Sequence, residues 1–175
     1  TVPANSGGNL GTITRTYNTI AAAESGSPTL IGGGSPSDLA TNNRRLTWVL
    51  YNDGPFNVSG ATTIDGYITT ATNYLTLTVA GASQVASGVS QRHRGRAGTG
   101  AALELQSTIG NYVLRVLDPY TRVEWLEIDG NDYTTWAGIW VDPTANDTLL
   151  RQLLVHDVEN TGTSQSDGFG IAVDG

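Results

Sequence analysis

The sequence contains no cysteine, methionine or lysine, and only 14% of its 175 residues are charged. Without cysteine, the chain can form no disulfide, no thiolate metal site and no cysteine nucleophile. The 9 arginines are outnumbered by 16 acidic residues, and the resulting net charge of -7 disfavours non-specific binding of nucleic acid. No apolar run reaches the roughly 18 residues of a membrane span. We therefore expect neither a nucleic-acid partner nor a membrane-spanning helix.

The abundant residues are those of strands and turns. Threonine and glycine, with 24 and 22 residues, make up about a quarter of the chain. The hydrophobic share of 38%, taken with the glycines, is average for a soluble globular domain. One folded domain is the natural expectation for this length.

Only one segment is a good helix candidate. Residues 17–26 contain three consecutive alanines and end at Gly26, a residue that commonly terminates helices. A helix this short must pack against the rest of the protein to be stable. We expect residues 1–45 to form an extended lead-in, this capping helix and a loop rich in glycine, serine and proline.

From residue 46 onward, short β-type runs alternate with turn residues. Many of the runs alternate apolar and polar side chains, as in Leu103 and Leu105 against Glu104 and Gln106, which places one face in a core. The expected strands are residues 46–51, 62–64, 74–79, 102–106, 112–117, 122–129, 138–141, 149–157 and 170–173.

Two stretches of the chain resemble each other. Residues 123–129 align with 150–156, and residues 138–142 align with 170–174, with an insertion around 160–167 in the second copy. A repeat of this length, carried by strands without intervening helices, favours a parallel β-solenoid over residues 46–175. A β-sandwich also uses many short strands, but hairpin signals are scarce here, and a repeat with a turn of variable length suits antiparallel pairing poorly.

The order of these segments resembles the right-handed parallel β-helix proteins of the pectate-lyase-like class. The resemblance lies in residues 15–23, where a Tyr-x-Thr-Ile helix closes the first coil, and in residues 92–100, 120–128 and 166–171, which are similar to segments of uncharacterised bacterial and phage-associated members. It implies an all-β, right-handed solenoid with a short N-terminal capping helix. It implies little about function, because the fold serves lyases, hydrolases, tailspikes and adhesins.

An open β-solenoid has unpaired backbone groups at both ends, and these invite further strand pairing. The expected helix covers the first end, but residues 170–173 form a strand-like run with no capping segment after it. We expect either that the protein continues beyond Gly175 or that another subunit covers this end. Stacking of subunits through such contacts would produce a filament or multimer.

Acidic residues punctuate the predicted turns. Stacked coils lie about 5 Å apart, so Asp142 should sit above Asp174, and Asp129 near His156. Paired carboxylates suit a hard cation such as Ca²⁺, and the candidate metal ligands are Asp129, Asp132, Asp142 and Asp174. The alternative is that these side chains only cap turns. Ca²⁺ is the one cofactor that the sequence suggests.

Arg92, Arg94 and Arg96 surround His93 and form the one dense basic patch of an acidic chain. Guanidinium groups bind carboxylate and sulfate groups bidentately, so this patch is a candidate site for an acidic polysaccharide. The alternative is a solvated surface loop. His156 beside Asp157 suggests acid-base chemistry, but we expect a structural role, because no nucleophile is evident.

Trp136 and Trp140 are candidates for stacking on sugar rings if they face outward, whereas partial burial under a neighbouring coil is the usual alternative. Trp48 and Trp125 raise the same question. We therefore expect a non-catalytic, extracellular or cell-surface solenoid that serves a structural or surface-interaction role, with self-association or a polysaccharide as its partner. A polysaccharide lyase or hydrolase, which would use Asp129, Asp132 or Asp157, and a trimeric phage receptor-binding fibre are the alternative hypotheses.

Overall fold

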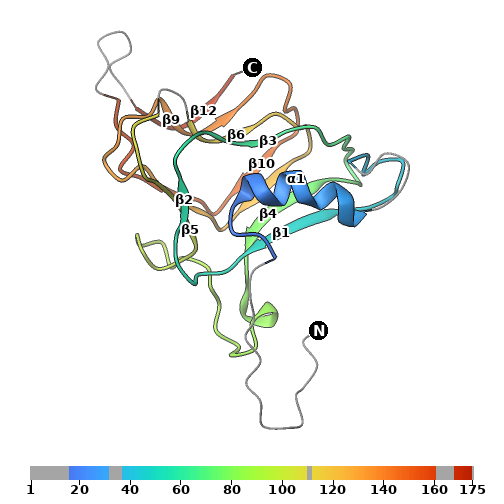
Figure 1. Ribbon diagram of the computed structural model, residues 1–175, viewed down its shortest axis with the longest axis horizontal. Helices are drawn as coiled ribbons and strands as arrows, with labels where there is room; N and C mark the ends of the chain where they lie inside the picture. The colour runs from blue at the N-terminus through green and yellow to red at the C-terminus, as the bar shows by residue number, and fades with distance from the viewer. Residues whose placement is uncertain (1–15, 32–36, 110–111, 161–167, 175) are drawn as a thin grey trace.

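The protein is a three-sided parallel β-solenoid with one helix in front of its first coil (Figure 1). The computed structural model describes residues 16–31, 37–109, 112–160 and 168–174. The expected fold class, an all-β solenoid with a short N-terminal helix, is confirmed. The expected lead-in and most of the insertion at 160–167 lie outside the described residues.

Each coil contributes one strand to each of three parallel sheets, and four coils are stacked. The first sheet contains β1 (Leu46–Leu50), β4 (Leu75–Val79), β7 (Arg122–Glu124) and β10 (Leu149–Arg151). The second contains β2 (Phe56–Val58), β5 (Ala102–Leu105), β8 (Glu127–Asp129) and β11 (Leu154–His156). The third contains β3 (Thr62–Ile64), β6 (Tyr112–Val116), β9 (Ala137–Val141) and β12 (Phe169–Val173). A short 3-10 helix, η1 (Ala82–Gln84), lies between β4 and β5.

The sheet register confirms the internal repeat. Val123 pairs with Leu150 and Ile128 with Val155, as the first aligned stretch predicts. Ile139 pairs with Ile171, as the second predicts. All of the pairings between named strands are parallel, which excludes the β-sandwich for the described residues.

Two of the expected strands are each divided by a corner of the solenoid. Trp125, with a φ of 61°, separates β7 from β8, and Gln152, with a φ of 53°, separates β10 from β11. The two corners are stacked, and the Trp125 N–H donates to the Arg151 carbonyl over 3.1 Å. The single strands expected at 122–129 and 149–157 are therefore wrong, because the left-handed residue breaks the extended backbone. Strand β2 is not among the strands expected from the sequence.

An apolar lumen holds the coils together. Leu77 and Val123 from the first sheet and Ile128 from the second are fully buried there. Burial of one such side chain stabilises the fold by about 1.5–3 kcal/mol. In the third sheet Ile139 is likewise fully buried, but its partner Ile171, in the last of the described coils, is 43% exposed.

Helix α1 (Ile20–Ile31) covers the N-terminal end of the lumen (Figure 1). Ile20 and Ala23 are buried, and the Trp48 indole N–H donates to the Ser27 hydroxyl over 2.9 Å. These contacts supply the tertiary support that a short helix needs.

The helix begins later and ends later than the sequence predicts. The Thr19 hydroxyl accepts from the Ala22 N–H over 3.1 Å, which places the start near Thr19 rather than Tyr17. Gly26 does not end the helix; a Cβ at that position would lie 2.5 Å from the Tyr17 ring, so glycine is needed there for packing.

The helix also accommodates a proline. Pro28 lies inside it and cannot donate to the Glu24 carbonyl, one turn earlier. The Tyr67 hydroxyl donates to that carbonyl instead, over 3.1 Å. A tertiary contact from the first coil therefore replaces the backbone hydrogen bond that proline removes.

A group of acidic side chains joins the helix to the first two coils. The Glu24 carboxylate accepts from the Asp65 N–H over 2.6 Å, and the Asp118 carboxylate accepts from the Gly66 and Tyr67 N–H groups. Burial, with smaller contributions from the charges of Asp118 and Asp65, raises the pKa of Glu24 to about 7 against the lowering effect of the hydrogen bond from the Asp65 N–H. Burial likewise raises the pKa of Asp118 to about 6.

Because the folded-state pKa of Glu24 is raised, this residue favours folding at low pH, and its contribution is lost as the pH rises toward and through 7. We expect the Glu24→Gln variant to lose less stability than the unmodified protein between pH 5 and pH 8. The difference should be on the order of 1 kcal/mol, because solvent screens a half-buried carboxyl group. Urea unfolding at the two pH values measures it, with Asp147→Asn as the exposed-acid control. An identical pH dependence in Glu24→Gln would contradict this assignment.

Candidate functional site

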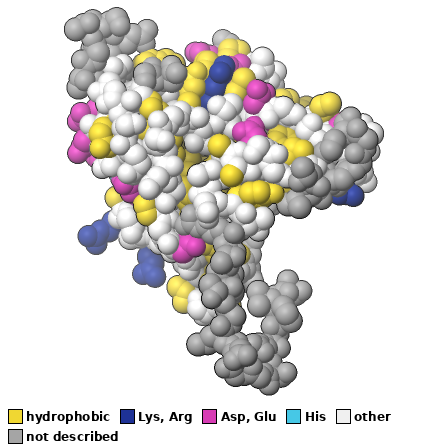
Figure 2. Space-filling view, in the orientation of Figure 1, with side chains coloured by type: hydrophobic (Ala, Val, Ile, Leu, Met, Phe, Trp, Pro, Cys, Tyr) yellow, Lys and Arg dark blue, Asp and Glu magenta, His cyan; other side chains and the backbone are white. Residues whose placement is uncertain are grey.

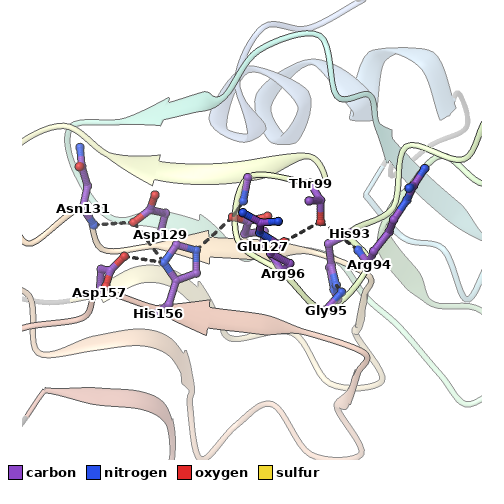
Figure 3. Close-up of polar contacts among 11 residues, drawn as sticks. His93, Arg94, Gly95, Arg96, Thr99, Glu127, Asp129, Asn131, His156 and Asp157 are labelled. Carbon is purple, nitrogen blue, oxygen red and sulfur yellow. Dashed lines mark hydrogen bonds and ion pairs between the residues drawn. The ribbon is translucent and has the colours of Figure 1, made fainter.

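Four side chains from the second sheet and the turns that follow it form a polar cluster, which we call the His156 cluster: Glu127, Asp129, His156 and Asp157 (Figure 3). Asp129 ends β8 and His156 ends β11, and these two residues are direct partners in the sheet register. Glu127 and Asp129 lie two residues apart on one strand, so both project to the side opposite Ile128. The register therefore brings all of these groups to one outer edge of adjacent coils.

Both ring nitrogens of His156 face carboxylate oxygens. The Nδ1 atom lies 2.7 Å from Asp157 Oδ2 and 3.6 Å from Asp129 Oδ1. The Nε2 atom lies 3.0 Å from Glu127 Oε1 on the other side of the ring. Burial acts to lower the pKa of His156, but the hydrogen bonds to Asp157 and Glu127 outweigh it, and the pKa is raised. Burial raises the pKa of Asp129, against the hydrogen bond that the Asn131 N–H donates to it.

Glu127 is buried although it lies on the outer side of the sheet. The loop between β4 and β5 covers it, and the Gly98 N–H donates to its Oε1 atom over 2.7 Å. Its Oε2 atom is buried and has no hydrogen-bond partner among the described residues. A buried carboxylate oxygen without a partner is costly, so this atom is the least satisfied acceptor of the cluster.

The basic patch predicted from the sequence is divided by the structure. His93 is buried, and its ring accepts from the Gly95 N–H at Nδ1 and lies 2.7 Å from the Gln152 carbonyl at Nε2. Arg92 donates to the Val79 carbonyl over 3.1 Å and lies over the Trp125 ring. These two residues attach the loop to the solenoid corner. Arg94 and Arg96 are exposed, and no ion pair to either is present among the described residues (Figure 3).

The four predicted metal ligands do not lie in one site. Asp129 belongs to the His156 cluster, whereas Asp132 is exposed in the following turn. Asp142 accepts from Arg115 over 2.6 Å, and Asp174 accepts from the Trp140 indole N–H over 3.1 Å. Asp142 and Asp174 occupy equivalent positions, as predicted, and both line a pocket of about 400 Å³.

Within the part of the chain that the structure describes, one group has three potential metal-ligating atoms close together. It consists of Asp129, His156 and Asp157, whose ligand atoms all lie within 4.8 Å of one another. Glu127 was not among the site residues expected from the sequence. Its place could have been inferred, because it lies two residues before Asp129 on the same strand and therefore on the same outer side, next to the strand of His156.

The second feature is a set of aromatic side chains on the outer side of the third sheet, which we call the aromatic face: Tyr112, Trp136, Trp140 and Phe169. The Trp140 ring lies 4.5 Å from Tyr112 and 6.1 Å from Trp136, and Phe169 lies 5.5 Å from Trp136. Phe169 is exposed and the other three are half-buried. Hydrophobic side chains and a basic side chain are visible together near the top of Figure 2, where β6, β9 and β12 run in Figure 1.

Arg115 connects the aromatic face to a carboxylate. Its guanidinium group lies 4.4 Å from the centre of the Trp140 ring and donates to Asp142. Trp48 and Trp125 differ from this pair, because Trp48 is buried against Tyr67 and Trp125 lies at a corner between Arg92 and His93. Of the four tryptophans, only the two predicted as ligand-binding contribute to the aromatic face.

Comparisons with protein-family models, with curated proteins and with solved structures find no match. The resemblance to the pectate-lyase-like class is therefore supported only in its coarser part, the parallel β-solenoid. No helix among the described residues is long and apolar enough to cross a membrane.

Gly130 allows the two turns of the His156 cluster to approach each other. Its N–H donates to the His156 carbonyl over 3.0 Å, and a Cβ at this position would collide with the Asp157 carbonyl oxygen. We expect Gly130→Ala to lower the free energy of unfolding by about 1–3 kcal/mol, as overpacking does elsewhere. Urea unfolding measures the change. Gly60→Ala is the matched control because a Cβ there meets nothing within 4 Å; equal effects of the two substitutions would refute the close approach.

Proposed function

We propose that this solenoid is a non-catalytic surface-interaction module that binds a carbohydrate chain along its aromatic face. The observation that carries this proposal is the continuous contact of Tyr112, Trp136, Trp140 and Phe169 on the outer side of one sheet. Binding sites for small polar ligands combine apolar surface with a few well-placed polar groups.

The arrangement of the aromatic face suits an extended ligand. Tyr112 begins β6 and Phe169 begins β12, so the rings follow the stacking direction of the coils over about 10 Å. Aromatic rings offer rigid apolar surface to the C–H groups of a sugar. The Asp142 and Asp174 carboxylates next to this surface can accept hydrogen bonds from sugar hydroxyl groups.

The charge of the face favours a neutral polysaccharide over an acidic one. Arg115 is the cation of the face, and it is already paired with Asp142. The net charge of -7 repels polyanions at longer range. Polysaccharides are displayed outside cells, so this ligand class agrees with the extracellular or cell-surface location expected from the sequence.

One observation favours the enzymatic alternative, a lyase or hydrolase. The His156 cluster contains carboxyl groups and an imidazole within hydrogen-bonding distance, as acid-base catalysis requires. Arg92, however, is used in contacts within the protein. Release of new reducing ends or of unsaturated sugars from a polysaccharide panel would establish the enzymatic alternative.

The proposal does not require self-association. Helix α1 covers one end of the solenoid, so a second copy could stack there only against the helix. A filament and a trimeric fibre remain predictions that sedimentation velocity distinguishes from a monomer.

We expect Trp140→Ala to weaken binding of a neutral polysaccharide about tenfold, because the ligand loses one aromatic contact worth roughly 1–1.5 kcal/mol. Affinity electrophoresis with neutral and acidic polysaccharides measures the change. Tyr51→Ala is the control, since Tyr51 is an exposed aromatic residue after β1, on another side of the solenoid. The proposal would be refuted if Trp140→Ala and the unmodified protein were retarded equally in gels that contain neutral polysaccharide. It would also be refuted if no polysaccharide retarded the unmodified protein.

A further inference from the structure

The His156 cluster contains the donor set of a metal site. Its three potential ligands are one imidazole nitrogen, His156 Nδ1, and one carboxylate oxygen each from Asp129 and Asp157. Around a tetrahedral ion with bonds of about 2.1 Å, ligand atoms lie about 3.4 Å apart. The present separations of Nδ1 from the two carboxylate oxygens, 2.7 and 3.6 Å, bracket that spacing. All three ligand atoms lie within 4.8 Å of one another, so side-chain movements on the order of 1 Å would bring them to the spacing of a tetrahedral site.

Glu127 lies where a residue that orients a metal-bound histidine would lie. It approaches His156 from the side opposite to Asp129 and Asp157 and accepts at Nε2 over 3.0 Å (Figure 3). In the present arrangement Nδ1 donates to Asp157. A metal ion that replaced the hydrogen on Nδ1 would be held by the Nδ1 lone pair between the two aspartates, while the hydrogen on Nε2 would stay with Glu127. Metal-bound histidines have this same arrangement, in which the second ring nitrogen donates to a carboxylate that orients the ring.

The excess of negative charge in the cluster also favours a bound cation. Three carboxylates face a single imidazole, and no arginine is paired with any of them among the described residues. Glu127 is 1% exposed and its Oε2 atom has no hydrogen-bond partner there. Excess negative charge in a buried position is unfavourable, and a divalent cation would offset it.

We propose that Asp129, His156 and Asp157 bind one divalent transition-metal ion, of which Zn²⁺ is the first candidate, and that Glu127 is a positioning residue for the His156 ring. An imidazole ligand favours Zn²⁺ and its neighbours, whereas Ca²⁺ requires six to eight oxygen ligands. Water completes the coordination from the exposed side of Asp157. This inference does not depend on carbohydrate binding.

The ion would link two coils. Asp129 ends β8 in the third coil, whereas His156 ends β11 in the fourth and Asp157 follows it. Among the described residues the fourth coil is paired only with the third, and its strand β12 carries exposed apolar side chains. A bound ion would therefore add a link between the third and fourth coils, and its binding should raise the melting temperature by roughly 5–10 °C at about 100 times the dissociation constant.

Calorimetric titration of the EDTA-dialysed protein with Zn²⁺ tests the proposal, with Ca²⁺ as the comparison ion. We expect one Zn²⁺ per chain and little binding of Ca²⁺. His156→Gln should abolish Zn²⁺ binding, and Asp174→Asn, which alters a carboxylate outside the cluster, should leave it unchanged. Far-UV circular dichroism checks that each variant is folded.

Glu127→Gln tests the positioning role separately, because it keeps the size of the side chain. We expect Zn²⁺ affinity to fall about tenfold or more, and the visible absorption band of the Co²⁺-loaded protein to shift relative to that of the unmodified protein. A purely structural role for Glu127 would leave this band in place. Zn²⁺ binding that survives in folded His156→Gln, stoichiometric binding of Ca²⁺ in preference to Zn²⁺, or no binding of either ion to the folded protein would overturn the proposal.

Discussion

The structure depends on parallel stacking of coils in register. Each residue on a strand lies above its equivalent in the next coil, so a position that faces the lumen in one coil faces it in all of them. Leu77, Val123 and Leu150 form one such row, in which Leu77 and Val123 are fully buried and Leu150, in the last of the described coils, is partly exposed. The hydrophobic core is therefore one-dimensional, and each coil is stabilised only by its immediate neighbours.

The same constraint makes the ends of the stack its weakest parts, because strands there have unpaired edges. At the first coil, helix α1 covers the exposed end of the lumen. It buries Ile20 and Ala23 over the lumen, and Tyr67 supplies the hydrogen bond that Pro28 removes. In the fourth coil, by contrast, the lumen residue Val173 is 67% exposed among the described residues.

The parallel repeat could be predicted from the sequence, because strands stacked in register must carry apolar side chains at matching positions. The capping helix could be predicted from its run of alanines. Residues 123–129 align with 150–156 since the lumen demands apolar side chains at matching positions. The corners at Trp125 and Gln152 could not be predicted, because any residue with a tolerable left-handed conformation serves there. The cluster was predicted only in part: register brings Asp129 to His156, but the burial of Glu127 depends on Gly98, in a loop whose path no periodicity specifies.

Stacking in register also determines where charge accumulates. Outward side chains of adjacent coils are forced together whether or not their charges are complementary. At two places the neighbour is an arginine: Arg115 pairs with Asp142, and Arg151 with Glu124. Only around His156, among the described residues, do three carboxylates meet one imidazole, with one of them buried. The arginines of those pairs carry a fixed positive charge and bind carboxylates through several N–H groups, but they cannot bind a metal ion. Histidine is the residue that can exchange its proton for a metal ion while Glu127 holds the ring in place, and this difference in chemistry distinguishes the His156 cluster from the ordinary ion pairs of the same stack.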